Sequence, residues 1–159
     1  MKKTSEKTNV MRILDQNKLQ YESHYYTSTA AISGMEVASV LNQDANHVFK
    51  TLVTVGSSKN HYVFLVPVNK ELNLKKAAKA VNEKSIEMVK SKDLLNLTGY
   101  IHGGCSPIGM KKQFKTTIDI SATNCDTIIF SGGKIGYQVE ISLNELKKIL
   151  IFELNDISD

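Results

Sequence analysis

The sequence predicts a mixed α/β fold, in which one curled, barrel-like β-sheet is surrounded by helices. Three observations favour this class. The chain of 159 residues has about the length of one domain, and no repeat, low-complexity tract or Pro/Gly/Ser-rich linker divides it. Two pairs of apolar or β-branched segments are each separated by a short polar turn. Amphipathic helical segments alternate with these pairs, but not in the strict rhythm of a parallel βαβ sheet. We expect a single domain over residues 1–159, with a folded core from about 6 to 152.

The first third of the chain predicts a helix, a short strand and a second helix. Apolar residues at helical spacing indicate a helix over residues 6–16, and residues 21–26 have the composition of a short strand. Ser33 and Glu36 then have the spacing of a capping box, in which each side chain accepts from the other residue's backbone N–H. An apolar face follows, so we expect the second helix over residues 34–41.

The middle of the chain predicts a hairpin and two further helices. Residues 48–55 are rich in β-branched side chains, and residues 62–68 are apolar throughout, as in a strand buried on both faces. A polar turn between them indicates a hairpin. Asn73 is a suitable N-cap for a helix over about 74–81, and a fourth helix begins near Ser91 and ends at Gly99.

The last third predicts an irregular glycine-rich loop over residues 100–107, a second hairpin and a final helix. Segments 127–131 and 135–141 flank Gly132-Gly133-Lys134, a turn sequence typical of hairpins. Ser142 and Glu145 form a second capping-box pattern before an apolar helical face. We expect the tail after Leu154 to fray.

Composition excludes several classes of function. Hydrophobic residues make up 42% and charged residues 23% of the chain, as in ordinary soluble proteins. The net charge of +4 permits a phosphate-bearing partner without requiring one, and the single Arg, Arg12, argues against a reader of duplex DNA. No apolar run is long enough to cross a membrane, and residues 1–7 do not form a secretory signal. We expect a cytoplasmic protein with reduced thiols, although a disulfide between Cys105 and Cys125 stays open.

Common catalytic signatures do not occur. Segment 104–109 has one residue too many for a nucleophile elbow, and Gly133-Lys134 lacks the other residues of a Walker A loop. The cysteines lack zinc-site spacing. The four histidines lie apart, with no acidic partner in a recognisable register, and are interpreted as surface or loop residues: His24, His47, His61 and His102. We expect no metal and no cofactor.

Lys50 is the first candidate for a functional residue. Strand alternation places it on one face with Val48 and Leu52, in largely apolar surroundings. A desolvated ammonium must meet an anion or have a lowered pKa. Two ordinary explanations stay open: a lysine that extends to water from an edge strand, or one paired with a carboxylate such as Glu140.

The glycine-rich loop is the second candidate. Gly103 and Gly104 allow a close backbone approach, and their N–H groups can hold an oxyanion or a substrate carboxyl group. An ordinary turn is the alternative. Cys105 is a possible nucleophile if His102 or His24 lies close to it, whereas a buried Cys in this loop would be inert.

Taken in order, four segments resemble the YbaK-type Cys-tRNA(Pro) deacylases, a family related to the editing domain of bacterial prolyl-tRNA synthetase. The segments are 48–52, 66–68 with 74–78, 98–109 and 131–136. The resemblance implies a trans-editing enzyme that cleaves the ester between cysteine and the 3′-terminal adenosine of tRNA. The thiol of the substrate itself would attack the carbonyl, leaving a cyclic thiolactone, so no protein nucleophile is needed. It also implies that the partners are tRNA and prolyl-tRNA synthetase.

The same resemblance assigns individual residues. Lys50 matches the family's essential lysine, which is expected to meet the anionic 3′ end of the tRNA. Residues expected to contact the aminoacyl group are Tyr26, Thr51, Gly103, Gly104, Ser106 and Pro107. One departure is Gln138, two residues before Glu140, where well-known members carry an acidic residue.

Three alternatives to a Cys-tRNA(Pro) deacylase stay open. They are a deacylase specific for alanine on tRNA(Pro), a non-catalytic RNA- or synthetase-binding module, and a hydrolase that uses the Cys105 thiol. Two lysine stretches could contact tRNA or could be solvated surface: Lys75, Lys76 and Lys79, and Lys111, Lys112 and Lys115.

Overall fold

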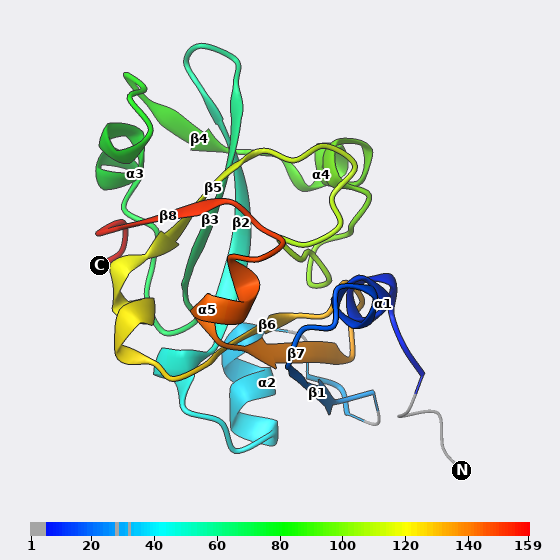
Figure 1. Cartoon of the computed structure of the whole chain (residues 1–159). Helices are drawn as coiled ribbons and strands as arrows, with labels where there is room; N and C mark the ends of the chain where they lie inside the picture. The colour runs from blue at the N-terminus through cyan, green and yellow to red at the C-terminus, as the bar shows by residue number, and fades with distance from the viewer. Residues whose placement is uncertain (1–5, 28, 32) are drawn as a thin grey trace.

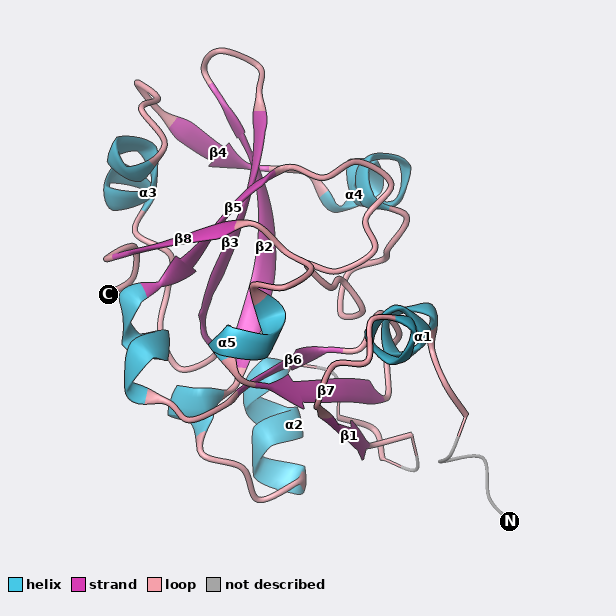
Figure 2. Ribbon diagram, viewed as in Figure 1, coloured by secondary structure: helices cyan, strands magenta, loops and turns pink. Residues whose placement is uncertain are grey.

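The computed structural model describes residues 6–27, 29–31 and 33–159, whose strands form two sheets flanked by helices (Figures 1 and 2). Residues 1–5, most of the segment tested for a secretory signal, lie outside this part. The larger sheet has the strand order β4-β2-β3-β5-β8 and the smaller one β1-β7-β6. The mixed α/β class is confirmed. The single barrel-like sheet is wrong, because the strands form two open sheets that are linked by a bridge between Val48 and Ile129.

The larger sheet is built around the first predicted hairpin. β2 (Phe49–Gly56) and β3 (His61–Pro67) pair antiparallel, as predicted. β5 (Lys115–Asp119) and β8 (Phe152–Asn155) continue the sheet in parallel. On the other edge, β4 (Ile86–Met88) pairs with residues 54–56 of β2. The first half of β2 therefore has β3 on one side and, on the other, no neighbour within this sheet in the described chain.

The smaller sheet contains the second predicted hairpin. β6 (Ile128–Ser131) and β7 (Tyr137–Ile141) pair antiparallel, and β1 (Glu22–Tyr25) lies on the other edge of β7. Val139 and its odd-numbered neighbours in β7 pack into the main core. Because side chains alternate along a strand, the even-numbered Gln138 belongs to the opposite face.

The helices begin where the capping residues predict. Thr8 accepts from Met11 N and starts α1 (Asn9–Gln16) three residues later than the apolar spacing indicates. The capping box of Ser33 and Glu36 is present at α2 (Gly34–Val40).

The later helices follow the same rule. Asn73 caps α3 (Leu74–Ala80), and Gly99 ends α4 (Ser91–Thr98) with φ +88°. Ser142 caps α5 (Leu143–Leu146), but the Glu145 carboxylate accepts from Gln20 N instead of completing the box. A left-handed C-terminal residue favours Gly at position 99.

The β2–β3 hairpin separates two apolar clusters. Phe64 and Val66 pack with α3, whereas Val63 and Leu65 belong to the main core together with residues of α4 and the smaller sheet. α3 and α4 consequently cover opposite faces of the larger sheet (Figure 1). No helix in the described part of the chain is long and apolar enough to span a membrane.

The C-terminal tail is ordered, so the prediction that it frays after Leu154 is wrong. β8 pairs with β5, and Ile157 is fully buried. The Ile157 N–H donates to Asp119 Oδ1 at 3.1 Å, and the Lys76 ammonium pairs with Asp156 and Asp159. These contacts join segments far apart in the sequence, which local composition does not reveal.

Candidate functional site

A cavity of about 750 Å³ lies between the two sheets, a volume typical of small-molecule sites. Its walls come from the first turn of α2, the edge of β2, the start of α4, the glycine-rich loop, and strands β6 and β7. The sheets are linked at the Val48–Ile129 bridge, and the cavity occupies the space beside it. Four residues predicted for the site line this cavity: Tyr26, Lys50, Thr51 and Gly103.

One edge of β2 borders the cavity at Thr51, where no strand of the larger sheet pairs with that edge in the described chain. Val68 N donates to Val48 O at 2.8 Å, so even-numbered residues of β2 exchange hydrogen bonds with β3. The peptide groups of odd-numbered residues face the other edge, where Val89 N donates to Val53 O at 3.0 Å. At Thr51 that edge borders the cavity. The buried Thr51 Oγ1 also has no hydrogen-bond partner among the described residues.

Lys50 carries the positive charge of the cavity lining. Its side chain is 28% exposed, and Nζ lies 3.5 Å from Oε2 of Glu71, which is 88% exposed. The ammonium therefore meets a carboxylate, as the ordinary explanation predicts, but the partner is Glu71 and not Glu140. An ion pair with a partner this exposed to water contributes little stability, so a substrate anion can replace Glu71 at low cost.

Two deeply buried polar side chains line the cavity. Tyr26 is 6% and Gln138 is 5% exposed. Gln43 Nε2 donates to Gln138 Oε1 at 2.8 Å. Within the described residues, neither the Tyr26 hydroxyl nor Gln138 Nε2 has a hydrogen-bond partner. Polar groups of buried residues are normally paired, so these two atoms are available to a ligand in the cavity.

Apolar side chains form much of the remaining wall. Phe49, Val53, Leu94 and Phe130 are buried and line the cavity. Such a wall accommodates a small apolar or thiol-bearing side chain. The cavity therefore combines a cation, unpaired polar groups and an apolar surface.

The glycine-rich loop contributes only part of its predicted set. Gly103, with φ +89°, lines the cavity. Gly104 packs against the backbone of Lys134 and Ile135, where an added Cβ would meet atoms at 3.2 to 3.4 Å. Ser106 has no exposed surface and Pro107 is buried; neither they nor Gly104 are among the residues that line the cavity. Their position suits a role in shaping the loop.

The thiol of Cys105 reaches the cavity lining but is poorly suited to nucleophilic attack. Burial raises its pKa to about 12, against a smaller opposing effect of a hydrogen bond with Thr98. A thiol with that pKa is almost entirely protonated at neutral pH, and the thiolate is the reactive form. Cys105 and Cys125 are both free, so the disulfide left open by the sequence does not occur.

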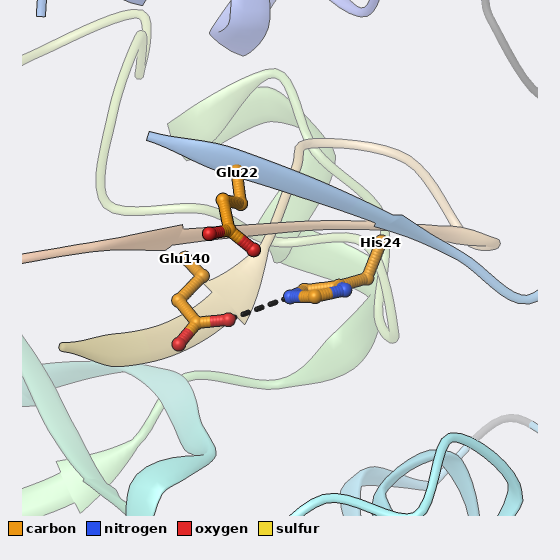
Figure 3. Close-up of side chains that lie close together, drawn as sticks. All are labelled: Glu22, His24 and Glu140. Atoms are coloured by element: carbon orange, nitrogen blue, oxygen red, sulfur yellow. Dashed lines mark hydrogen bonds and ion pairs between the residues drawn. The ribbon is translucent and has the colours of Figure 1, made fainter. Parts of the chain in front are cut away.

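A second polar cluster lies on β1 and β7 outside the cavity lining (Figure 3). His24 Nε2 and Glu140 Oε1 are 2.7 Å apart, and Thr127 donates to the other Glu140 oxygen. Glu22 lies opposite Glu140 in the strand register. Burial acts to raise the pKa of Glu140, but the hydrogen bonds from Thr127 and His24 outweigh it and lower the pKa below its usual value.

The second cluster corrects the expectation that the histidines lack an acidic partner. His24 and Glu140 are 116 residues apart in the sequence, so only the pairing of β1 with β7 brings them together. Their ligand atoms and that of Glu22 lie within 4.8 Å of one another, and imidazole with carboxylates is a donor set that divalent metals accept. The mutual hydrogen bonds already satisfy the His24–Glu140 pair.

Comparisons with known proteins place this architecture in a family. Residues 29–149 match the family model of the aminoacyl-tRNA editing domain. EbsC of Enterococcus faecalis, described as a candidate Cys-tRNA(Pro)/Cys-tRNA(Cys) deacylase, is 47% identical over 142 residues, which cover 89% of this chain and 87% of EbsC.

Two crystal structures share the fold. The hypothetical protein APE2540 is 19% identical, with a TM-score of 0.86 over 96% of this chain and 100% of that one. A candidate trans-editing enzyme for prolyl-tRNA synthetase is 22% identical, with a TM-score of 0.81 over 98% and 99% of the two chains. At these identities the likeness establishes the fold alone. The family match and the EbsC alignment, by contrast, each cover most of the sequence, and the chain therefore belongs to the aminoacyl-tRNA editing domain family.

Proposed function

We propose that this protein is a trans-editing deacylase that hydrolyses the ester of Cys-tRNA(Pro) and of Cys-tRNA(Cys). Membership of the editing family and the 47% identity to EbsC support this function. The observation that carries it is the cavity, which is lined by Lys50 and by Thr51, whose buried hydroxyl has no partner among the described residues. A cation with unpaired donors and acceptors suits the anionic 3′ end and aminoacyl group of a charged tRNA.

The proposed roles follow from these positions. Lys50 exchanges Glu71 for the anionic 3′ end and fixes the ester by electrostatic attraction. The hydroxyl of Thr51 hydrogen-bonds the aminoacyl group, Tyr26 shapes the pocket, and Gly103 allows close approach of the loop. Because an aminoacyl ester is already activated, positioning and stabilisation of the oxyanion supply much of the required rate enhancement.

The substrate supplies its own nucleophile in this mechanism. The cysteine sulfur attacks the carbonyl carbon, and the carbonyl electron pair moves to oxygen. When the carbonyl re-forms, the bond to the ribose oxygen breaks, and that oxygen leaves as a hydroxyl with the proton released by the thiol. The product is a cyclic thiolactone, which water opens to free cysteine. The high pKa of Cys105 agrees with a reaction that needs no protein thiolate.

We further propose that the protein acts in the cytoplasm together with prolyl-tRNA synthetase. A net charge of +4 predicts weak binding of tRNA by this chain alone, so a partner that holds the tRNA would raise its local concentration. Lys76 is already paired with Asp156 and Asp159, which leaves the stretch with Lys111 and Lys112 as the better candidate for RNA contact.

The test is release of amino acid from Cys-tRNA(Pro), Cys-tRNA(Cys) and Ala-tRNA(Pro) by the purified protein. We expect release of cysteine from both cysteinyl substrates and a loss of about 100-fold or more in Lys50→Ala. Lys147→Ala is the matched control, because Lys147 is an exposed lysine at the end of α5 outside the cavity. Preferential release of alanine would replace the proposed specificity, and absence of any release would favour a non-catalytic binding module.

A further inference from the structure

The cavity is also lined by the side-chain amide of Gln138, a residue that is 5% exposed. Gln138 lies on β7, opposite Ser131 of β6 and His24 of β1 in the strand register. A glutamine side chain offers a carbonyl acceptor at one end and two N–H donors at the other, so its orientation determines what the cavity presents at this wall.

In the structure Gln43 holds one orientation of that amide, and it does so with its own Oε1 buried and without a partner among the described residues. Its Nε2 donates to Gln138 Oε1 at 2.8 Å, which occupies the acceptor end of Gln138. The backbone of Gln43 is itself held, because its N–H donates to Ala38 O at 2.8 Å just beyond α2. The end of Gln138 left for a ligand is therefore Nε2, which bonds to no residue in the described chain. Gln138 borders the cavity, so an acceptor bound there would give Nε2 the partner that the described protein does not supply.

The chemistry of an aminoacyl ester indicates which atom that donor meets. An N–H group repels the α-ammonium and binds sulfur weakly, whereas a carbonyl oxygen is a strong acceptor. The carbonyl oxygen also gains negative charge when the carbonyl carbon is attacked, and a fixed donor in a water-poor cavity stabilises that charge. The carboxylate among the described lining residues belongs to Glu36, whose Oε1 accepts from Ser33 N at the cap of α2.

On the basis of the proposed function, we propose that Gln138 Nε2 donates to the ester carbonyl oxygen and stabilises the oxyanion formed on it. Gln43 is then a positioning residue, which acts on the reaction by keeping the donor end of Gln138 directed at the cavity. Attack by the cysteine sulfur places an electron pair on the carbonyl oxygen, and this pair returns when the carbonyl re-forms and the bond to the ribose oxygen breaks. The amide gains and loses no atom in either step.

The test of Gln138 is the single-turnover rate of cysteine release from Cys-tRNA(Pro). Gln138→Met keeps the length of the side chain and removes both N–H donors, and we expect the rate to fall about 100- to 1,000-fold. Substrate affinity should change less than about 3-fold, because the charge exists only in the transition state. Gln138→Glu should be at least as slow at pH 7 and should regain activity as the pH falls, because a protonated carboxyl can donate.

Gln43 is tested by two substitutions of opposite hydrogen-bonding character. Gln43→Lys still donates to Gln138 Oε1, so its rate should stay within about 3-fold of wild type. The carboxylate in Gln43→Glu can only accept a hydrogen bond, so the Gln138 amide should rotate and direct Nε2 at position 43. The cavity then loses this donor, and the rate should fall about 10-fold or more. If Gln43 had a purely structural role, the rates of Gln43→Lys and Gln43→Glu would not depend on whether the new side chain donates or accepts a hydrogen bond.

Several results would overturn the inference. An unchanged rate in Gln138→Met would do so, as would a Gln138→Glu enzyme faster than wild type, which would mean that the site binds the ammonium. Thermal unfolding of each variant checks that it folds, and Gln138→Glu decides through its pH profile if Gln138→Met does not fold. A wild-type protein that releases no cysteine would overturn the proposed function and this inference together, whereas an active wild type with an unaffected Gln138→Met overturns this inference alone.

Discussion

Gln138 and Glu140 lie two residues apart on β7 and share one face of the smaller sheet, yet their polar atoms are satisfied differently. Both oxygens of Glu140 have partners, His24 on one side and Thr127 on the other. Gln138 has one partner, Gln43, and its other end faces the cavity with none in the described chain.

The difference teaches how to separate architecture from function in this fold. In the His24–Glu140 cluster both carboxylate oxygens and His24 Nε2 have hydrogen-bond partners within the protein, so these atoms join β1 to β7 and are not free for a ligand. A buried donor or acceptor without a partner stays available to a ligand, at a cost to stability of about 1–3 kcal/mol. This criterion does not suffice alone, because the Thr117 hydroxyl of β5 is also buried without a partner in the described chain and does not line the cavity. Thr51 combines such a hydroxyl with a place on the cavity wall, and we therefore propose the cavity as the site of chemistry.

One hydroxyl removed from each region should separate the two regions in both activity and stability. Thr51→Val removes a hydroxyl that has no partner in the described chain, whereas Thr127→Val removes one that donates to Glu140. We expect Thr51→Val to lower cysteine release about 10-fold, the value of one hydrogen bond of about 1.4 kcal/mol, with unfolding stability unchanged or higher. Thr127→Val should lose about 1 kcal/mol of stability and keep its activity. Equal effects in the two variants would contradict the distinction.

A smaller effect concerns the pH dependence of stability at Glu140. The pKa of this carboxyl is lowered in the folded protein, so its stabilising contribution is complete above the unfolded pKa of about 4.3 and is lost as the pH falls through the lower, folded value. Glu140→Gln should be less stable than wild type at pH 7, by about 1–2 kcal/mol. The gap measured by thermal unfolding should close as the pH falls from about 5 towards 3. A gap that widens in acid would show that the carboxylate destabilises the fold.

The smallest expected effect on activity is that of Cys105→Ser. Because burial keeps the Cys105 thiol protonated and the proposed nucleophile belongs to the substrate, cysteine release should stay within about 3-fold of wild type. A time course of cysteine release from Cys-tRNA(Pro), quenched at set times, measures this rate. A loss above about 100-fold would assign the nucleophile to the protein and would move the chemistry to the glycine-rich loop.

Local signals predict much of this fold. The caps at Ser33, Asn73 and Ser142 begin their helices where the sequence indicates, and both hairpins form. β5 was not predicted, because Thr116 and Thr117 are buried polar residues that mask the apolar pattern of a strand. β8 and the buried Ile157 are stabilised by β5 and Asp119, which are distant in the sequence.

The candidate site likewise contains residues that the sequence predicts and a contact that only the structure shows. Strand alternation and glycine chemistry predict Lys50 and Gly103, the resemblance adds Tyr26 and Thr51, and the structure brings all four to one cavity. The hydrogen bond between Gln43 and Gln138 joins residues 95 positions apart. No spacing in the sequence reveals it, because the contact depends on how α2 packs across the face of the smaller sheet.

The most direct test of this account is the single-turnover rate of cysteine release from Cys-tRNA(Pro), measured side by side for Gln138→Met and Glu140→Gln. The two substitutions are near-isosteric, lie two residues apart and face the same side of β7. We predict a loss of about 100-fold or more in Gln138→Met and a change within about 3-fold in Glu140→Gln. A large loss in Glu140→Gln with little change in Gln138→Met would contradict the account.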